Sequence, residues 1–268
     1  MDIGVRVLGV FWCLIPYGCG AQVGSLQQME RAETLAHERA GQELVAYMGL
    51  ETMFPDQRVR TLAQAAGNGN LMALASLVDS GVDVNARGNR NATPLFWAMR
   101  SGSLQGFNEL LRLGADPNVV FDDGGTVIHW AVRHASADFL KAALAHGGDP
   151  NLRAGQLRET PMFEALGERS DRLGLLLDAG GDPDVQDSFF GSTVLLIAAG
   201  RGRFDLVMVM LEHGADFRLR NKIGSSLKDV IAEKRDLMDP QHELYAWMQR
   251  VTQWLEARGV EVPASRNR

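Results

Sequence analysis

The chain has 268 residues and a formal net charge of −6 at pH 7. This acidic balance argues against a nucleic-acid partner, which would favour a basic surface. Both cysteines, Cys13 and Cys19, precede residue 20, so the rest of the chain offers no disulfide framework and no thiol for catalysis.

The chain begins with the features of a secretory signal peptide over residues 1–21. Residues 7–15 are a short apolar run after Arg6, and Cys19 and Ala21 stand at the minus-three and minus-one positions of a small-residue cleavage site. The run is too short for a comfortable membrane span. We therefore expect export to the periplasm and removal of residues 1–21, which carry one acid and one base and so leave the net charge unchanged.

Other interpretations of this leader stay open. Gly18 before Cys19 resembles a bacterial lipoprotein site, although Pro16 and Tyr17 depart from the residues usual there. A lipidated Cys19 or an uncleaved leader would anchor the protein in the membrane, facing the periplasm. The run could also be a buried helix of a cytosolic protein, but no charged residue occurs between residues 7 and 29.

Residues 22–54 are expected to form an N-terminal capping helix. Between Leu26 and Met48 the apolar residues fall roughly on one helical face, against charged residues such as Glu30 and Glu38. The repeats that follow need such a lid, because an ordinary terminal unit would leave its apolar side in water.

Residues 55–222 repeat a pattern with a period near 33 residues. Threonine recurs at Thr93, Thr126, Thr160 and Thr193, with spacings of 33, 34 and 33. A Gly-x-Asp triplet closes each unit and occurs five times, at 81–83, 114–116, 147–149, 180–182 and 214–216. A constant period of this length predicts an array in which each unit stacks on its neighbours.

The opening Thr-Pro-Leu-x-x-Ala of residues 93–98 is the pattern of the ankyrin-repeat family, and the chain resembles that family from about residue 56 to residue 222. The resemblance implies an all-α fold, a solenoid of about five repeats with helical N- and C-terminal caps. Pro94 and Pro161 keep the proline of the family, whereas Val127 and Val194 depart from it.

Each recurring residue has a structural role. The threonine hydroxyl can accept a hydrogen bond from a free N–H at the start of the first helix, and proline suits the first turn. Apolar residues at helical spacing form the core, and glycine suits a left-handed helix end. The gap from Thr160 to Gly180 is 20 residues, where the other units have 21, so we expect a shortened turn near residues 168–170.

Residues 223–268 are expected to form C-terminal capping helices and a tail. Asp239 and Pro240 suit a helix start, and apolar residues follow at three- and four-residue steps as far as Leu255. This helix would close the open end of the array. Its two tryptophans, Trp247 and Trp254, could instead form a groove for a partner.

No motif predicts catalysis, a cofactor or a metal site. His129 occupies the usual histidine position of the family, where it generally braces neighbouring loops. His37 and His242 lack the second histidine of a zinc-protease helix, and residues 122–125 lack the alternating ligands of a calcium loop. We therefore expect a protein that is not an enzyme.

Residues at positions that the ankyrin fold does not require for its own stability indicate a protein-binding surface. Family members bind partners through loop tips and exposed positions of the first helices. Exposed aromatic and arginine side chains are typical of interface hot spots. The candidate partner-binding residues are Trp97, Arg100, Phe121, Trp130, Arg133, His134, Phe189, Phe190, Ile197 and Arg201. Alternatively, Trp97 and Trp130 pack on each other and only enlarge the core.

Two functions compete. The chain resembles exported bacterial ankyrin proteins that are encoded beside antibacterial phospholipase effectors of type VI secretion and serve as immunity proteins. It also resembles exported ankyrin proteins that accompany catalases as periplasmic stress-protection scaffolds. An aromatic and cationic face favours tight binding of one toxin. The neighbouring gene would discriminate between the two functions, because a lipase gene favours the immunity role and a catalase gene favours the stress-protection role. A eukaryotic-style effector directed at a host is a third hypothesis. It is disfavoured because the leader would be removed at the inner membrane.

Overall fold

The computed structural model describes residues 45–122, 124–154, 159–167 and 171–263. These residues form helices joined by loops, and their extended pairing is limited to two isolated β-bridges, Ala154 with Glu159 and Gln186 with Thr193. The expected all-α fold is confirmed. The predicted signal peptide, both cysteines, most of the N-terminal cap and the expected short turn at 168–170 lie outside the described residues.

Two short helical turns, α2 (Leu50–Met53) and η2 (Asn89–Asn91), accompany a series of helix pairs. The pairs are α3 (Gln57–Gly67) with α4 (Leu71–Asp79), α5 (Pro94–Arg100) with α6 (Leu104–Arg112), α7 (Val127–Arg133) with α8 (Asp138–Ala145), α9 (Pro161–Glu164) with α10 (Asp171–Asp178), α11 (Val194–Gly200) with α12 (Phe204–Glu212), and α13 (Leu227–Arg235) with α14 (Glu243–Glu256). Among the described residues, no helix is both long and apolar enough to cross a membrane.

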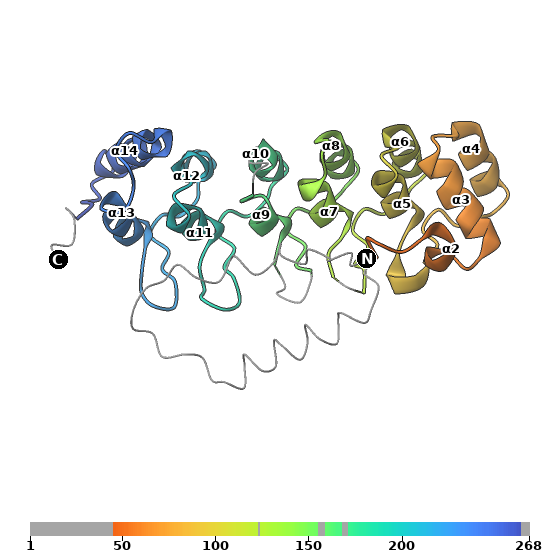
Figure 1. Ribbon diagram of the computed structural model, residues 1–268, viewed down its shortest axis with the longest axis horizontal. Helices are drawn as coiled ribbons and strands as arrows, with labels where there is room; N and C mark the ends of the chain where they lie inside the picture. Colours follow the sequence, from red (N-terminus) through yellow and green to blue (C-terminus); the bar gives the residue numbers. More distant parts are fainter. Residues whose placement is uncertain (1–44, 123, 155–158, 168–170, 264–268) are drawn as a thin grey trace, which may run out of the picture. The chain divides into compact units, whose positions relative to one another are not determined.

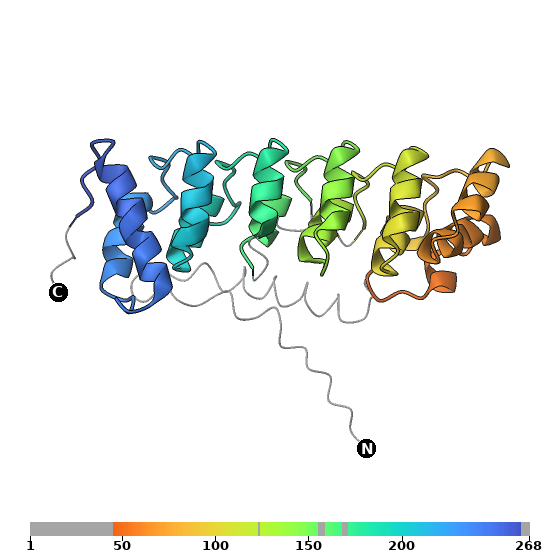
Figure 2. The same cartoon turned by 90° about the horizontal axis from the view of Figure 1, so that it is seen from above.

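Each pair packs on the next. The first helix α3 contacts α5, which contacts α7, while the second helices α4, α6, α8, α10, α12 and α14 form their own continuous row. The loops that join one pair to the next project beyond the first helices, on the side away from the second helices (Figure 1). Figure 2 shows the same succession of pairs from above. The first helices and the loop tips therefore share one side of the array.

Threonine side chains start the first helices as expected. The hydroxyls of Thr93, Thr126 and Thr193 each accept a hydrogen bond from a backbone N–H of the first turn at 3.2 Å. The valines that replace proline after Thr126 and Thr193 leave this cap in place. Thr160 is the exception, because its buried hydroxyl has no hydrogen-bond partner within the described part of the chain and α9 is only four residues long.

Asparagine side chains join successive repeats across the turns. Asn118 donates from Nδ2 to the carbonyl of Gly147 at 2.8 Å, and its Oδ1 accepts from the N–H of Asp149 at 2.7 Å. Asn85 and Asn151 make the same two bonds one repeat before and one repeat after. We call this series the asparagine ladder. At its next position stands Asp184, whose carboxylate accepts from the N–H of Asp216 at 2.8 Å.

The recurring aspartates of the Gly-x-Asp triplets serve the turns. The carboxylates of Asp83, Asp116, Asp149, Asp182 and Asp216 each accept a hydrogen bond from the backbone N–H two residues further along. An aspartate that bonds its own backbone in this way fixes a turn.

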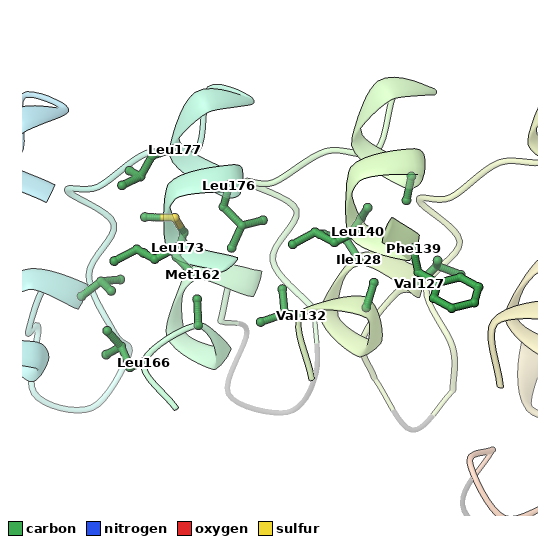
Figure 3. Packing of buried hydrophobic residues seen from close by; sticks show 14 of the residues in the cluster. Val127, Ile128, Val132, Phe139, Leu140, Met162, Leu166, Leu173, Leu176 and Leu177 are labelled. Atoms are coloured by element: carbon green, nitrogen blue, oxygen red, sulfur yellow. The ribbon is translucent and has the colours of Figure 1, made fainter. Parts of the chain in front are cut away.

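One apolar core runs through all the pairs. Figure 3 shows Ile128 and Leu140 on the α7–α8 pair and Met162 and Leu173 on the next pair, and all four side chains are buried. Helices approach closely enough that a Cβ at Gly106 would lie 1.9 Å from the carbonyl oxygen of Ala66. Only glycine fits at that contact.

The C-terminal cap is a sixth helix pair rather than a separate lid. Ser226 lies 33 residues after Thr193 and starts α13 with a capping box to Asp229, while α13 packs on α11 and α14 packs on α12. The expectation that the last helix starts at Asp239 is wrong, since α14 is capped by Nδ1 of His242, which accepts the N–H of Leu244 at 3.1 Å. Its buried face is nevertheless the expected one.

The described end of the predicted N-terminal helix is not one continuous helix. Residues 45–47 form a turn, and α2 is a single turn after Gly49. Val45, Met48, Met53 and Phe54 are buried, so these residues belong to the core without helical periodicity. We call residues 45–54 the N-terminal strap.

Candidate protein-binding surface

Trp97 and Arg100 lie one turn apart on α5. The guanidinium carbon of Arg100 lies 4.8 Å from the centre of the Trp97 ring, and the ring itself is half-buried. An arginine held over an aromatic face gains a cation–π attraction and loses mobility. The two predicted residues therefore form one stacked unit.

The N-terminal strap contacts this unit. Nη1 of Arg100 donates to the carbonyl of Met48 at 2.5 Å and to the carbonyl of Val45 at 3.4 Å. Further along the strap, Asn89 donates to the carbonyl of Thr52 at 2.7 Å, and Arg60 donates to the carbonyl of Phe54 at 3.3 Å. Arg100 thus serves the chain's own strap, a role that the sequence did not reveal.

Trp130 and Arg133 repeat the arrangement on α7. Arg133 lies 4.4 Å above the Trp130 ring and forms an ion pair with Glu164 at 3.6 Å. Trp130 is half-buried and packs edge-on against Phe96, with ring centres 5.7 Å apart. Its indole nitrogen is buried without a hydrogen-bond partner among the described residues.

Phe121 is a correction to the predicted surface. Its ring is only 2% exposed and lies 4.8 Å from the ring of Phe96. The loop that carries Phe121 forms a tight turn, since the N–H of Phe121 donates to the carbonyl of Gly125 at 3.0 Å. The side chain fills the core instead of facing a partner.

His134 serves packing at the end of α7. Its ring lies edge-on to Phe139 at 4.4 Å, and its Nδ1 accepts the N–H of Ser136 at 3.1 Å. The backbone carbonyls of His134 and Ala135 accept hydrogen bonds from Arg172, a side chain that is only 4% exposed on α10. Sequence reasoning missed this buried arginine, because no local pattern distinguishes it from an exposed one.

Ile197 occupies the position on α11 that is equivalent to Trp97 and Trp130, whereas Arg201 follows the last residue of α11, one place beyond the position of Arg100 and Arg133. Ile197 is half-buried against the core, and Arg201 is exposed. Burial raises the pKa of the nearby Glu159, and the carboxylates of Glu164 and Asp187 raise it further, whereas Arg201 opposes them. This part of the first-helix side therefore mixes both signs of charge.

His129 braces two loops, as expected. Nδ1 accepts the N–H of Thr126 at 3.2 Å, and Nε2 lies 3.2 Å from the carbonyl oxygen of Glu159, to which it donates in the neutral tautomer. Burial lowers the pKa of His129 to about 4, against the opposing effect of the Glu159 carbonyl. The described residues hold no group of three or more His, Cys, Asp and Glu arranged to hold a metal ion.

Phe189 and Phe190 are exposed, as predicted, at the tip of the loop before α11. Each is 61% exposed. Asp187 orders the tip, because its Oδ1 accepts the N–H groups of Phe189 and Phe190 at 2.8 and 2.6 Å and its Oδ2 accepts the N–H of Ser192 at 2.7 Å.

Comparison with known proteins identifies the repeat. A model of multiple ankyrin repeats matches residues 95–144, and a model of the single ankyrin repeat matches residues 190–222. The crystal structure of EF0377, an ankyrin repeat protein, has a TM-score of 0.58 at 23% identity and covers 73% of this chain and 97% of its own. The fold is an ankyrin-repeat solenoid.

Two further structures share the ankyrin-repeat fold. The ankyrin repeat domain of Bcl-3 has a TM-score of 0.60 at 27% identity and covers 71% of this chain and 85% of its own. A chain from the complex of the Bdellovibrio bacteriovorus predatory endopeptidase Bd0816 with immunity protein Bd3460 has a TM-score of 0.54 at 22% identity, with coverages of 71% and 97%. No curated protein sequence matches the chain.

Within the ankyrin-repeat frame, the predicted residues separate into three groups. Trp97, Trp130 and Ile197 lie at one equivalent position of the first helices, Arg100 and Arg133 lie at another, and Arg201 follows the end of α11. Phe189 and Phe190 lie at a loop tip, and Phe121 and His134 belong to the packing. The solenoid thus presents a first-helix surface and a separate tip.

Proposed function

We propose that this ankyrin-repeat solenoid is a non-enzymatic scaffold that binds one protein partner through its first helices. The observation that carries the proposal is the repeated tryptophan–arginine stack on α5 and α7. Each arginine is held over a ring that limits its motion, but Arg100 also holds the N-terminal strap, so Arg133 is the arginine of the two that we assign to the partner. A pre-ordered guanidinium loses little entropy when it binds a carboxylate.

More specifically, we propose an immunity protein that binds and neutralises a secreted antibacterial phospholipase effector. The leader, size and caps resemble those of exported ankyrin proteins encoded beside such effectors and equally those of the catalase-associated proteins, and the aromatic and cationic first-helix surface is what favours the immunity role. The chain from the Bd0816–Bd3460 complex adds that this fold occurs in a complex between a bacterial endopeptidase and its immunity protein. Tight binding of one toxin requires a few well-ordered anchors, and Arg133, with its side chain 48% exposed above Trp130, is the best placed.

We also propose that the protein acts in the bacterial periplasm, because residues 1–21 have the pattern of a signal peptide. The intact mass of protein recovered from the periplasm tests this. Loss of residues 1–21 is the expected result, a mass increase at Cys19 would instead support a membrane-anchored lipoprotein, and soluble cytosolic protein that retains Met1 would contradict export.

The decisive experiment is to sequence the neighbouring gene and, where it encodes a lipase-type effector, to co-express the two proteins, with growth and complex formation measured together. We expect the chain to protect cells and to co-elute with the effector. Arg133→Ala should weaken the complex by about tenfold, which is 1.4 kcal/mol. Arg250→Ala is the matched control, since Arg250 lies 4.5 Å above Trp247 on α14, away from the first helices.

The proposal fails if the wild-type chain neither binds nor protects. A catalase gene at the same locus, with peroxide sensitivity of cells that lack the chain, would then favour the alternative role as a periplasmic stress-protection scaffold. If the wild-type chain protects but Arg133→Ala and Arg250→Ala behave alike, the immunity role stands and the α7 surface is not the binding site.

A further inference from the structure

Two neighbouring loop tips near the C-terminal end of the array expose large apolar side chains. Phe189 and Phe190 are each 61% exposed, and Ile223, on the following tip, is 71% exposed. The N–H of Lys222 donates to the carbonyl of Phe190 at 2.8 Å, so the two tips touch. We call Phe189, Phe190 and Ile223 the apolar tips.

The apolar tips are held in place by hydrogen bonds. Besides the three amide bonds to Asp187, the ammonium group of Lys222 donates to the carbonyls of Ser188 and Phe189 at 2.7 and 2.9 Å. Gln186 joins the tips at their base by donating to the carbonyl of Arg220 at 3.2 Å. Because the tip is already ordered, its backbone loses little conformational entropy when the phenylalanines bind a ligand or a surface.

Cationic side chains flank the apolar tips. Arg153, Arg220 and Lys222 are exposed, and each donates to a backbone carbonyl of these loops. The one carboxylate of the Phe189–Phe190 tip, that of Asp187, is only 8% exposed and faces the backbone amides that it accepts. Arg220 also forms an ion pair with Asp229 at 3.3 Å, so Arg153 and Lys222 supply the positive charge that flanks the apolar projection in a chain of net charge −6.

From this arrangement we propose that the apolar tips dock on an anionic phospholipid surface. Side chains that project from two tips suit the boundary between headgroups and acyl chains, where apolar groups enter by roughly 5–10 Å. Lysine and arginine near an anionic leaflet add attraction that decays within a Debye length. A protein partner would need a far larger contact, since specific interfaces bury about 800 Å² on each side, and three side chains cannot supply it.

The inference does not depend on the immunity role, because it concerns loop tips and not the first helices. Both surfaces can act together, because the tips and the first helices share one side of the array (Figure 1). A protein docked by its tips would hold its first-helix side toward the bilayer.

Co-sedimentation of the full chain with vesicles tests the docking. The probes are vesicles of phosphatidylcholine alone and of phosphatidylcholine mixed with phosphatidylglycerol. We expect stronger binding to the mixed vesicles, weakened by added salt. The double variant Phe189→Ser, Phe190→Ser should lower the partition coefficient by about tenfold or more, with an unchanged melting temperature. Met72→Ser is the matched control, because Met72 is 86% exposed on α4, away from the tips.

Depth measurement separates the tips from any other membrane contact of the full chain. Brominated acyl chains quench tryptophan, so Phe190→Trp should gain quenching on the mixed vesicles and Met72→Trp should not. The proposal is overturned if the chain binds neither vesicle, if the Met72→Ser and tip variants lose binding equally, or if Phe190→Trp is not quenched. Loss of effector binding in the double variant without any vesicle binding would assign the tips to the protein partner instead.

Discussion

Replacing Asp184 by asparagine should stabilise the protein, because Asp184 stands where the asparagine ladder requires a donor. Asn85, Asn118 and Asn151 each make two bonds to the following repeat, one as donor and one as acceptor. Asp184 makes only the accepting bond, to the N–H of Asp216. An asparagine at this position would add a donor for the carbonyl of Gly214, the counterpart of Gly147.

The expected gain is about 1 kcal/mol in the free energy of unfolding, which is the usual net contribution of one added hydrogen bond. Electrostatics adds a dependence on pH. Burial raises the pKa of Asp184 above its ordinary value of 3.8, and the carboxylates of Asp182 and Asp216 add to this, although the hydrogen bond from Asp216 acts in the opposite direction. Because the pKa of Asp184 is higher in the folded state than in the unfolded state, the ionised carboxylate destabilises the folded state above the folded pKa, and this destabilisation vanishes below 3.8. Asp184→Asn should therefore gain more at pH 7 than near pH 4.

Urea unfolding at the two pH values measures both effects. Asn118→Asp is the mirror-image control, since it removes the donor to Gly147 and places a new carboxylate between Asp116 and Asp149, so it should lose at least about 1 kcal/mol at pH 7. The reasoning is refuted if Asp184→Asn is no more stable than the wild type at pH 7, or if its gain is the same at both pH values.

Three further outcomes are expected. The pKa of His129 is about 4 in the folded chain and 6.5 when unperturbed, so between these pH values the imidazole is protonated in the unfolded state and neutral in the folded state. The free energy of unfolding should therefore fall by about 3 kcal/mol as the pH drops from 6.5 to 4. His129→Gln should lack this pH dependence in acid unfolding. Deleting residues 240–268 removes α14 from α12 and should cause aggregation or a clearly lower melting temperature, whereas a soluble truncation of unchanged stability would contradict the capping role. Trp130→Ala should cost about 2 kcal/mol of folding, roughly half the value for a fully buried ring, and should weaken effector binding about thirtyfold; a lowered melting temperature with unchanged affinity would exclude α7 from the binding surface.

The helix starts could be predicted because the signals are local. A threonine hydroxyl caps the N–H two or three residues along at Thr93, Thr126 and Thr193, so the period of about 33 residues marks these helix starts. The sixth pair was missed for the same reason. Ser226 keeps the spacing and the cap of Thr193, but the proline and alanine that identify the family opening do not follow it.

The surface was harder to predict, because exposure at a loop tip depends on distant residues. Phe121 turns inward since there is room beside Phe96, whereas Phe189 turns outward on a tip ordered by Asp187. Contact between Arg100 and Met48 depends on the path of the N-terminal strap, which no periodicity encodes. The sequence thus located the repeat positions, and tertiary packing decided which of them face solvent.

The short helix α9 has a consequence for how the array opens. Stability in a solenoid is roughly a sum of each repeat's own folding and its nearest-neighbour contacts, and α9 has one turn and an uncapped start where its counterparts have seven residues. Fluctuations should therefore separate the chain into two cooperative blocks at this repeat, where Arg172, His129 and the Arg133–Glu164 ion pair connect the repeat to the earlier block. In native-state hydrogen exchange, the amides of Phe163 and Ala165, which donate to the carbonyls of Thr160 and Met162, should exchange before those of either flanking repeat.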